Sequence, residues 1–148
     1  MFAGGNAGWS KYCNYYKDAN EYKTSGINFK YLRYADVLLI MAECESIRSG
    51  GSQDAAAGLI DQVHTRTGLI SIGAGLSKAQ IFDALVHERK VELAGEQSRF
   101  NDIVRWGISS TKLAGTNFTI GKHEHLPIPQ SEIDSNTNMT SADQNPSY

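Results

Sequence analysis

The stretch YLRYADVLLIMAECESI, residues 31–47, decides the fold class of this chain. Its apolar residues recur at steps of three and four, which is the spacing of one face of an α-helix. The residues on this predicted face are Tyr34, Val37, Leu38, Met41, Ala42 and Glu45. Cys44 falls within the same apolar pattern, and we expect it to be a small buried residue.

The residues that follow turn the chain back into a second helix. Ser49-Gly50-Gly51-Ser52 ends the first helix, and Ser52 or Asp54 can cap the second by accepting hydrogen bonds from its free amides. The second helix ends near Gly68 and carries the apolar residues Ala55, Leu59, Ile60 and Val63. Together the two helices form a hairpin of roughly the 34-residue size of a tetratricopeptide unit. About three such units usually stack to bury their apolar faces, so this hairpin needs further cover.

A third helix, predicted over residues 78–96, supplies cover within the chain. Ser77 is its expected cap. One side of the helix carries Ile81, Phe82, Leu85, Val86 and Leu93. Gly95 indicates a break, after which a shorter helix runs through Phe100 to Trp106 and ends at Gly107.

Beyond this helix the sequence loses the helical period. Residues 118–120 predict a short strand, and residues 126–129 must be extended because proline disfavours helix at the residue before it. Residues 130–134 predict one helical turn, and the Asn/Ser/Thr-rich tail predicts a loop. The predicted fold class is therefore mainly α, with a tetratricopeptide-like helical hairpin, further helices and a loop-rich C-terminal segment.

The composition limits the classes of partner that we expect the chain to bind. The 148 residues include 14 Lys and Arg and 16 Asp and Glu, for a formal net charge of −2, with no long run of one sign. We therefore expect no nucleic-acid partner. No stretch approaches the roughly 20 apolar residues that span a bilayer. The start MFAGG lacks the basic and apolar regions of a signal peptide, so we expect the chain as written to be soluble.

Several motifs resemble the C-terminal signature of the SusD/RagB family, outer-membrane glycan-binding lipoproteins of Bacteroidetes-type bacteria. In the family's order they are LRYADVLL (32–39), Ala42-Glu43, Val63 with Arg66-Thr67-Gly68-Leu69, ERKVELA (88–94), Arg99, Asp102, Arg105-Trp106-Gly107, LPIPQ (126–130) and Gln144-Asn145-Pro146. The resemblance divides the chain into an aromatic, Gly-rich loop segment at residues 1–30 and a SusD/RagB-like C-terminal helical domain at residues 31–148.

The chain departs from the family pattern at two positions. Gln97 stands where a glycine commonly follows Glu96, and Ser147 replaces a glycine commonly found before the final tyrosine. If the first glycine supplies a positive φ angle, Gln97 adopts it at a cost that glycine does not pay.

The resemblance implies a function for the complete protein. Family members are surface lipoproteins that bind an oligosaccharide or polysaccharide and pass it to a partner SusC-like TonB-dependent transporter. They are several times longer than this chain, so the resemblance implies a C-terminal fragment of such a protein. In the family the glycan contacts come chiefly from regions upstream of the matched part.

The aromatic opening segment is the stretch best suited to sugar. Aromatic rings stack on the apolar face of a pyranose, while amide and carboxylate groups bond its hydroxyls. The candidate glycan-binding residues are Trp9, Asn14, Tyr15, Tyr16 and Asp18. The alternative is that these rings cover the helical hairpin as core or rim residues.

Glu88 and Glu92 are a candidate catalytic pair, and the alternative function they indicate is that of a small glycoside hydrolase. They stand four residues apart, so their carboxylates lie on one helix face, as the two carboxylates of a glycoside hydrolase require. The competing interpretation is that arginines and carboxylates pair to neutralise a helix junction. The arginines are Arg89, Arg99 and Arg105, and the carboxylates are Glu88, Glu92, Glu96 and Asp102. Interleaved arginines lower carboxylate pKa values. We therefore favour the structural interpretation, with no catalytic residues. A structural remnant that self-associates is a third alternative.

No cofactor or metal site is expected. His87-Glu88 starts a zinc-protease motif, but the position of the second histidine is Val91. His123 and His125 lack an evident third ligand and predict an exposed turn. Cys13 and Cys44 form no recognisable disulfide framework, and we do not expect them to pair.

Overall fold

The computed structural model describes residue 11 and residues 28–148. All regular elements in this part of the chain are helices, which confirms the predicted mainly α fold class. They are α1 (Tyr34–Ile47), α2 (Gln53–His64), η1 (Thr65–Thr67), α3 (Lys78–Glu92), α4 (Arg99–Arg105), α5 (Ser109–Lys112), α6 (Gln130–Ser135) and η2 (Ser141–Asp143). None of the described helices combines the length and the apolar composition that a bilayer crossing needs.

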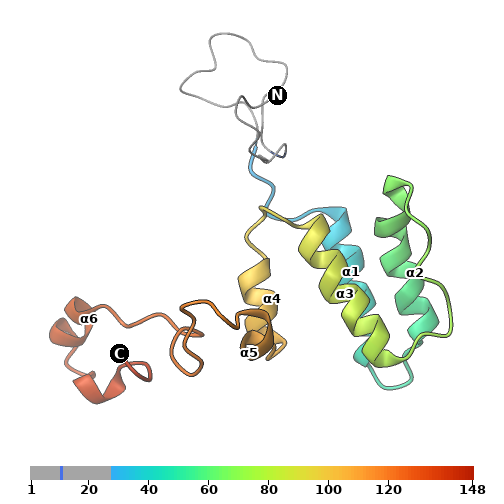
Figure 1. Ribbon diagram of the computed structural model, residues 1–148. Coiled ribbons are helices and arrows are strands. Elements are labelled where there is room, and N and C mark those ends of the chain that lie inside the picture. The colour runs from blue at the N-terminus through green and yellow to red at the C-terminus, as the bar shows by residue number, and fades with distance from the viewer. Residues whose placement is uncertain (1–10, 12–27) are drawn as a thin grey trace, which may run out of the picture. The chain divides into compact units, whose positions relative to one another are not determined.

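The chain divides into two compact units, Met1–Arg99 and Phe100–Tyr148. In the first unit, α1, α2 and α3 lie side by side, and each contacts the other two (Figure 1). All three helices contribute to the core, because the largest fully buried side chains are Leu39 from α1, Ile60 from α2, and Ile81 and Leu85 from α3. The third helix therefore covers the hairpin as the sequence predicts.

The buried face of α1 differs from the predicted one. Ala35, Leu38, Leu39, Ala42 and Ser46 are buried. Tyr34 and Met41, which the prediction placed on the apolar face, are 73% and 50% exposed. The prediction that Cys44 is buried is also wrong, since its free thiol is exposed. α1 is apolar nearly all round, so spacing alone does not select one face.

Local capping sets the ends of the helices in this unit. The Ser52 hydroxyl accepts a hydrogen bond from the Ala55 amide at 3.1 Å. Ser77 and Gln80 form a reciprocal capping box at the start of α3, as the sequence indicates for Ser77. α3 ends at Glu92 rather than at residue 96. The chain turns there through Gly95, whose φ of 78° is accessible to glycine at little cost.

The second unit is built from short helices and connecting loops. α4 ends in a Schellman motif, in which Gly107 donates to the Val104 carbonyl and Ile108 to the Ile103 carbonyl, at 3.0 and 3.1 Å. Gly107 has the expected positive φ, 67°. α6 confirms the helical turn predicted after Pro129. The strand predicted over residues 118–120 is wrong, because this segment lies among turns.

The boundary predicted after residue 30 stays a prediction. Most of residues 1–30 lie outside the part of the chain that the structure describes. The division observed in the structure instead falls inside α4, between Arg99 and Phe100.

Candidate functional site

Arg33 is the centre of an ion-pair cluster in the helical unit. This residue precedes α1 and reaches the last turn of α3 and the turn beyond it. Its Nη1 donates to Glu92 Oε1 and its Nε to Glu96 Oε2, both at 2.8 Å, and its Nη2 donates to the Glu92 carbonyl at 3.0 Å. All three guanidinium nitrogens are therefore used to fix the start of α1 against the end of α3.

Two further cations complete the contacts of these carboxylates. Arg66 Nη2 donates to Glu92 Oε2 at 2.8 Å. Lys11 Nζ pairs with Glu96 Oε1 at 2.5 Å, donates to the Ala94 carbonyl at 3.2 Å and also contacts the Glu92 carbonyl. Carbonyls near the end of a helix carry the negative end of its dipole, so a lysine there is favourable.

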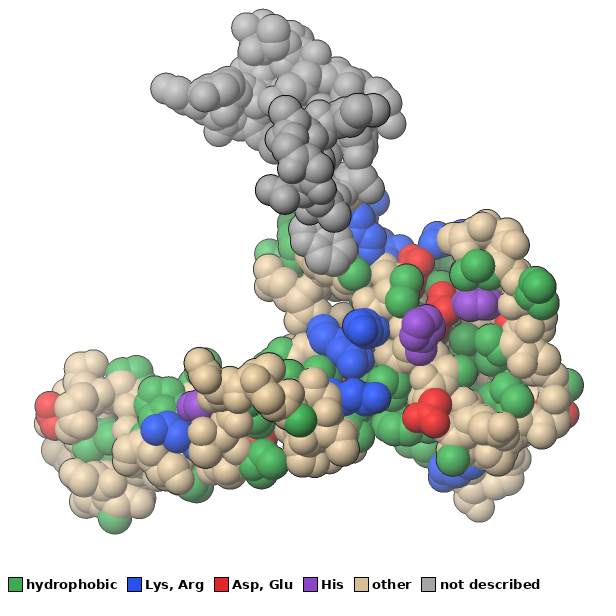
Figure 2. Space-filling model, viewed as in Figure 1, with side chains coloured by type: hydrophobic (Ala, Val, Ile, Leu, Met, Phe, Trp, Pro, Cys, Tyr) green, Lys and Arg blue, Asp and Glu red, His purple; other side chains and the backbone are tan. Residues whose placement is uncertain are grey.

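Two more pairs connect the helices nearby. His64 Nδ1 lies 2.7 Å from Glu88 Oε2, and Arg89 Nη1 lies 2.7 Å from Asp36 Oδ1. Glu88 and Arg89 are both buried on α3. Figure 2 shows basic, acidic and histidine side chains gathered on the helical unit. Each buried charge that is described here has a partner, which is the condition under which burial is tolerated.

The cluster shifts the pKa values of two of its members. The pKa of Arg33 is raised above its usual range, chiefly by the hydrogen bond to Glu96, against the opposing effect of burial. For Glu96, burial acts to raise the pKa, but hydrogen bonds and charge attraction from Arg33 and Lys11 outweigh it, and the net pKa is lowered. Both residues are thus held in their charged forms.

The predicted helix-junction network exists, but most of its partners differ from those expected. The pair of Arg105 with Asp102, at 3.0 Å, joins two residues named in that prediction. Glu92 is held by Arg33 and Arg66, and Glu88 by His64. The sequence signal for Arg33 was its place in the LRYADVLL motif, although spacing gave no hint of its partners. The hydrolase alternative for Glu88 and Glu92 stays a prediction.

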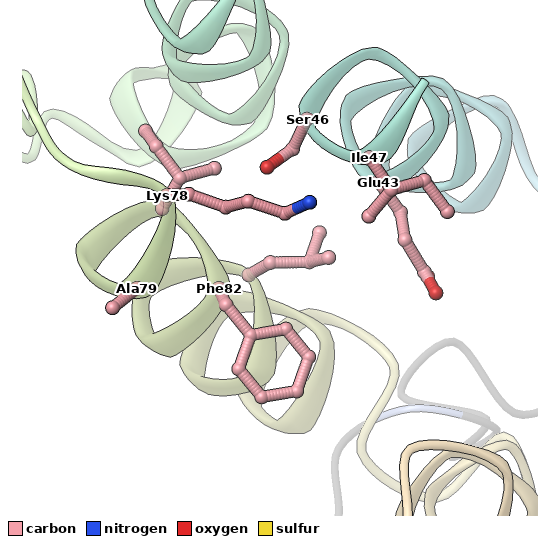
Figure 3. Close-up of a pocket in the computed structure, with 8 residues that line it drawn as sticks. Glu43, Ser46, Ile47, Lys78, Ala79 and Phe82 are labelled. Atoms are coloured by element: carbon pink, nitrogen blue, oxygen red, sulfur yellow. The ribbon is translucent and has the colours of Figure 1, made fainter. Parts of the chain in front are cut away.

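An apolar pocket of about 440 Å³ lies between α1 and α3. Ile47 and Ser46 face it from α1, and Ile81, Phe82 and Leu85 face it from α3. Figure 3 shows the Lys78 side chain extending from α3 toward α1, with Glu43 on the α1 side. The pocket offers mostly apolar surface with one charge of each sign at its edge, which suits an apolar group better than a sugar.

A second pocket, of about 370 Å³, lies between the start of α1 and the end of α2. Its lining is more polar and includes Arg33, Tyr34, Gln62 and Arg66. It therefore adjoins the ion-pair cluster through the two arginines.

In the second unit, the Gln144-Asn145-Pro146 motif is hydrogen-bonded to the LPIPQ motif. The Gln144 side chain accepts from the Ile128 amide at 2.8 Å and donates to the Ile128 carbonyl at 3.0 Å. Asn145 Nδ2 donates to the Leu126 carbonyl at 2.6 Å, and the Tyr148 hydroxyl to the His125 carbonyl at 3.1 Å. The LPIPQ and Gln144-Asn145-Pro146 motifs thus have a structural explanation, because side-chain amides satisfy the backbone of an extended segment.

The remaining site predictions fall into two groups. The candidate glycan-binding residues Trp9, Asn14, Tyr15, Tyr16 and Asp18 lie outside the described residues. Among the described residues, no three His, Cys, Asp or Glu side chains are grouped to hold a metal ion. His123 Nδ1 instead accepts from the Thr119 amide at 2.8 Å within a turn.

Comparison with known proteins identifies the family. The model of the SusD family matches residues 5–118. The chain belongs to the SusD family. Two SusD-like proteins of Formosa agariphila, P2 and P25, are 31% and 32% identical over 87% and 75% of this chain. A crystal structure of a SusD homologue from Bacteroides thetaiotaomicron VPI-5482 covers 84% of the chain with a TM-score of 0.71 and 30% identity.

The chain spans about a quarter of the length of these SusD-family relatives. The matched part is 28% of the length of P2 and 23% of the length of P25. It is also 28% of the length of the Bacteroides chain. The fold described above therefore corresponds to about a quarter of those proteins.

Proposed function

We propose that this chain is the C-terminal part of a SusD-like protein that captures glycans at the outer-membrane surface. The complete protein would bind an oligosaccharide or polysaccharide and pass it to a SusC-like TonB-dependent transporter. Membership of the SusD family carries this proposal. The order of the family motifs, from LRYADVLL to Gln144-Asn145-Pro146, supports a position at the C-terminal end.

Within this proposal, the helical unit supports the glycan site and residues 1–30 contribute contacts to sugar. The proposed contacts are Trp9, Asn14, Tyr15, Tyr16 and Asp18. Lys11 lies inside this segment of the sequence and bonds to Glu96 and to two carbonyls near the end of α3.

Isothermal titration against a panel of plant and host glycans tests the proposal. We expect measurable binding to at least one glycan. Trp9→Ala or Tyr15→Ala should reduce it tenfold or more, since a ring stacked on an aromatic side chain contributes on the order of 1–3 kcal/mol. Tyr31→Ala is the matched control, because Tyr31 is 92% exposed and lies outside the proposed contacts. Uniformly flat heats across the panel would remove the binding claim.

The transporter partnership needs its own experiment. The complete protein and a candidate SusC-like TonB-dependent transporter of the same organism would be co-expressed, extracted in detergent and purified through a tag on one of them. We expect the two to copurify in a fixed ratio. Recovery of the tagged protein alone, at matched expression of its partner, would contradict the partnership and leave the glycan-binding proposal intact.

A further inference from the structure

The pocket between the start of α1 and the end of α2 has the shape and lining of a small polar binding site. Its volume is about 370 Å³. Ala35, Leu38 and Val63 line it and are themselves buried, so they form an apolar floor. Tyr34, Gln62 and Arg66 line it as exposed side chains. An apolar floor with a few polar groups around it is the usual composition of a site for a small ligand.

The polar groups of these three side chains are available to a ligand. Neither the Tyr34 hydroxyl nor the Gln62 amide makes a hydrogen bond in the described part of the chain. Tyr34 is 73% exposed, so its ring is accessible for stacking. Arg66 donates from Nη2 to Glu92, and its Nε and Nη1 donors have no acceptor among the described residues.

The ion pair with Glu92 fixes Arg66 in position. Glu92 also accepts from Arg33, whose side chain is only 18% exposed, so the carboxylate itself is held on its other side. A guanidinium oriented in advance loses less side-chain entropy when it binds a ligand. Its Nη1 group can donate a charge-assisted hydrogen bond to a carboxylate oxygen of a ligand.

The charges around the pocket favour an anion. The charged side chains that line it are Arg33 and Arg66, both cations. Cationic groups in the lining attract an anionic ligand more strongly than a neutral one.

We propose that this pocket binds an acidic sugar unit, a uronate, with the pyranose ring on Tyr34, its hydroxyls bonded to Gln62 and its carboxylate bonded to Arg66. The inference rests on the proposed glycan-binding function and specifies a second contact region, separate in sequence from the aromatic segment. It also predicts the substrate class: a glycan that contains uronic acids.

Titration with matched ligands tests the inference. The probes are short oligogalacturonides and the same oligomers with their carboxylates reduced to alcohols. We expect the acidic oligomers to bind about tenfold or more tightly than the reduced ones, because a hydrogen bond to a charged group contributes about 1.5–3 kcal/mol. Arg66→Gln should remove this preference. Tyr34→Ala and Gln62→Leu should each weaken both oligomers, by about fivefold.

Two control variants separate binding from folding. Arg48→Gln removes an arginine whose side-chain exposure, 56%, matches the 55% of Arg66, but which pairs with Glu45 away from the pocket. Tyr31→Ala removes a more exposed tyrosine that does not line the pocket. Both should bind like the parent chain, and circular dichroism should show the same helix content in all five variants.

The outcomes distinguish this inference from the proposed function. If a neutral glycan from the wider panel binds and no uronate oligomer does, the pocket inference is overturned and glycan binding stands. The same holds if uronates bind but Arg66→Gln leaves their affinity unchanged. If no glycan of either kind gives heat with the complete protein, the proposed function itself fails.

Discussion

Arg33 and Glu96 lie 63 positions apart in the sequence, yet Arg33 Nε donates to Glu96 Oε2 at 2.8 Å. The same guanidinium holds Glu92, so a single side chain connects the start of α1 to the end of α3. The side chain of Arg33 is only 18% exposed, that of Glu96 8% and that of Glu92 12%. The cluster is therefore a partly buried charge network at the junction of the helical hairpin with the helix that covers it.

Arg33→Met should destabilise the helical unit. It leaves two largely buried carboxylates with fewer partners, and removing one partner of a buried ion pair costs about 3–5 kcal/mol. We expect a value near the lower limit, about 3 kcal/mol, because Lys11 and Arg66 still contact these carboxylates. Urea unfolding followed by circular dichroism measures it. Arg48→Met is the matched control and should change stability little, because its pair with Glu45 is solvent-exposed. Equal losses in the two variants would contradict the role of the cluster.

Acid should weaken the helical unit in a defined pH range. The pKa of Glu96 is lowered from its ordinary value of 4.5, because hydrogen bonds from Arg33 and Lys11 outweigh the effect of burial. A lowered folded-state pKa stabilises the fold above the unfolded-state pKa, and this contribution is lost as pH falls through the folded-state value. Stability should thus decline below pH 4.5, and Glu96→Gln should flatten that decline.

Salt provides the control for this pH dependence. The pKa of Glu45 is also lowered, by hydrogen bonds from the Arg48 side chain and the Ser52 amide, so it contributes with the same sign. That pair is exposed, and salt should screen it, whereas the Glu96 contribution should persist in salt. A pH profile in high salt that is the same for Glu96→Gln and the parent chain would contradict the prediction.

Gln97→Gly should stabilise the protein. Gln97 has φ of 63°, and it stands where the family commonly has glycine. A left-handed conformation costs a residue with a side chain roughly 1–2 kcal/mol, which glycine avoids. Against this, glycine raises the entropy of the unfolded state, which lowers stability by about 0.4–1 kcal/mol. We therefore expect a net gain in stability of about 0.5–1 kcal/mol. Thermal unfolding measures it. Gln97→Ala, which keeps a Cβ, should bring no such gain; a gain of equal size in Ala and Gly would show that backbone strain is not the cause.

Gln144→Ala should open the contact between the two C-terminal motifs. The Gln144 amide satisfies both backbone groups of Ile128, so its loss exposes the Ile128 N–H to solvent exchange. Hydrogen exchange at Ile128 should accelerate about tenfold, since a backbone hydrogen bond contributes on the order of 1 kcal/mol or more. Gln130→Ala is the control: Gln130 bonds Asp134 at 2.7 Å on the exposed side of α6. Unchanged exchange at Ile128 in Gln144→Ala would refute the assignment.

Short-range sequence signals predicted the local features of this fold well. Ser77 at the start of α3, Gly107 after α4 and the positive φ at Gln97 each depend on residues within one turn of the chain. Ser147, the other departure from the family pattern, also has a positive φ, 69°. The resemblance to family glycines was the useful signal here, because it marks where the backbone is left-handed.

Long-range partners could not be predicted in the same way. Interleaved charges on α3 indicated a network, but Arg33 and Arg66 come from the hairpin, and only the packing of three helices brings them to Glu92. The prediction of which face of α1 is buried was wrong for a related reason. Its residues are apolar on several faces, and contacts with α2 and α3 decide which of them is buried.

The exposed side of α1 should drive self-association of the isolated chain. Ile40, Met41 and Ile47 are 42%, 50% and 60% exposed on this helix, and Cys44 is an exposed free thiol among them. Exposed apolar patches favour association.

In a Cys13→Ser background, mild oxidation should yield a Cys44-linked dimer, and light scattering should show a concentration-dependent rise in mass. Met41→Lys with Ile47→Lys should abolish both signals, whereas Lys substitution at Leu126, which is 83% exposed in the second unit, should not. A monomer at all concentrations, with no cross-linked species, would contradict the prediction.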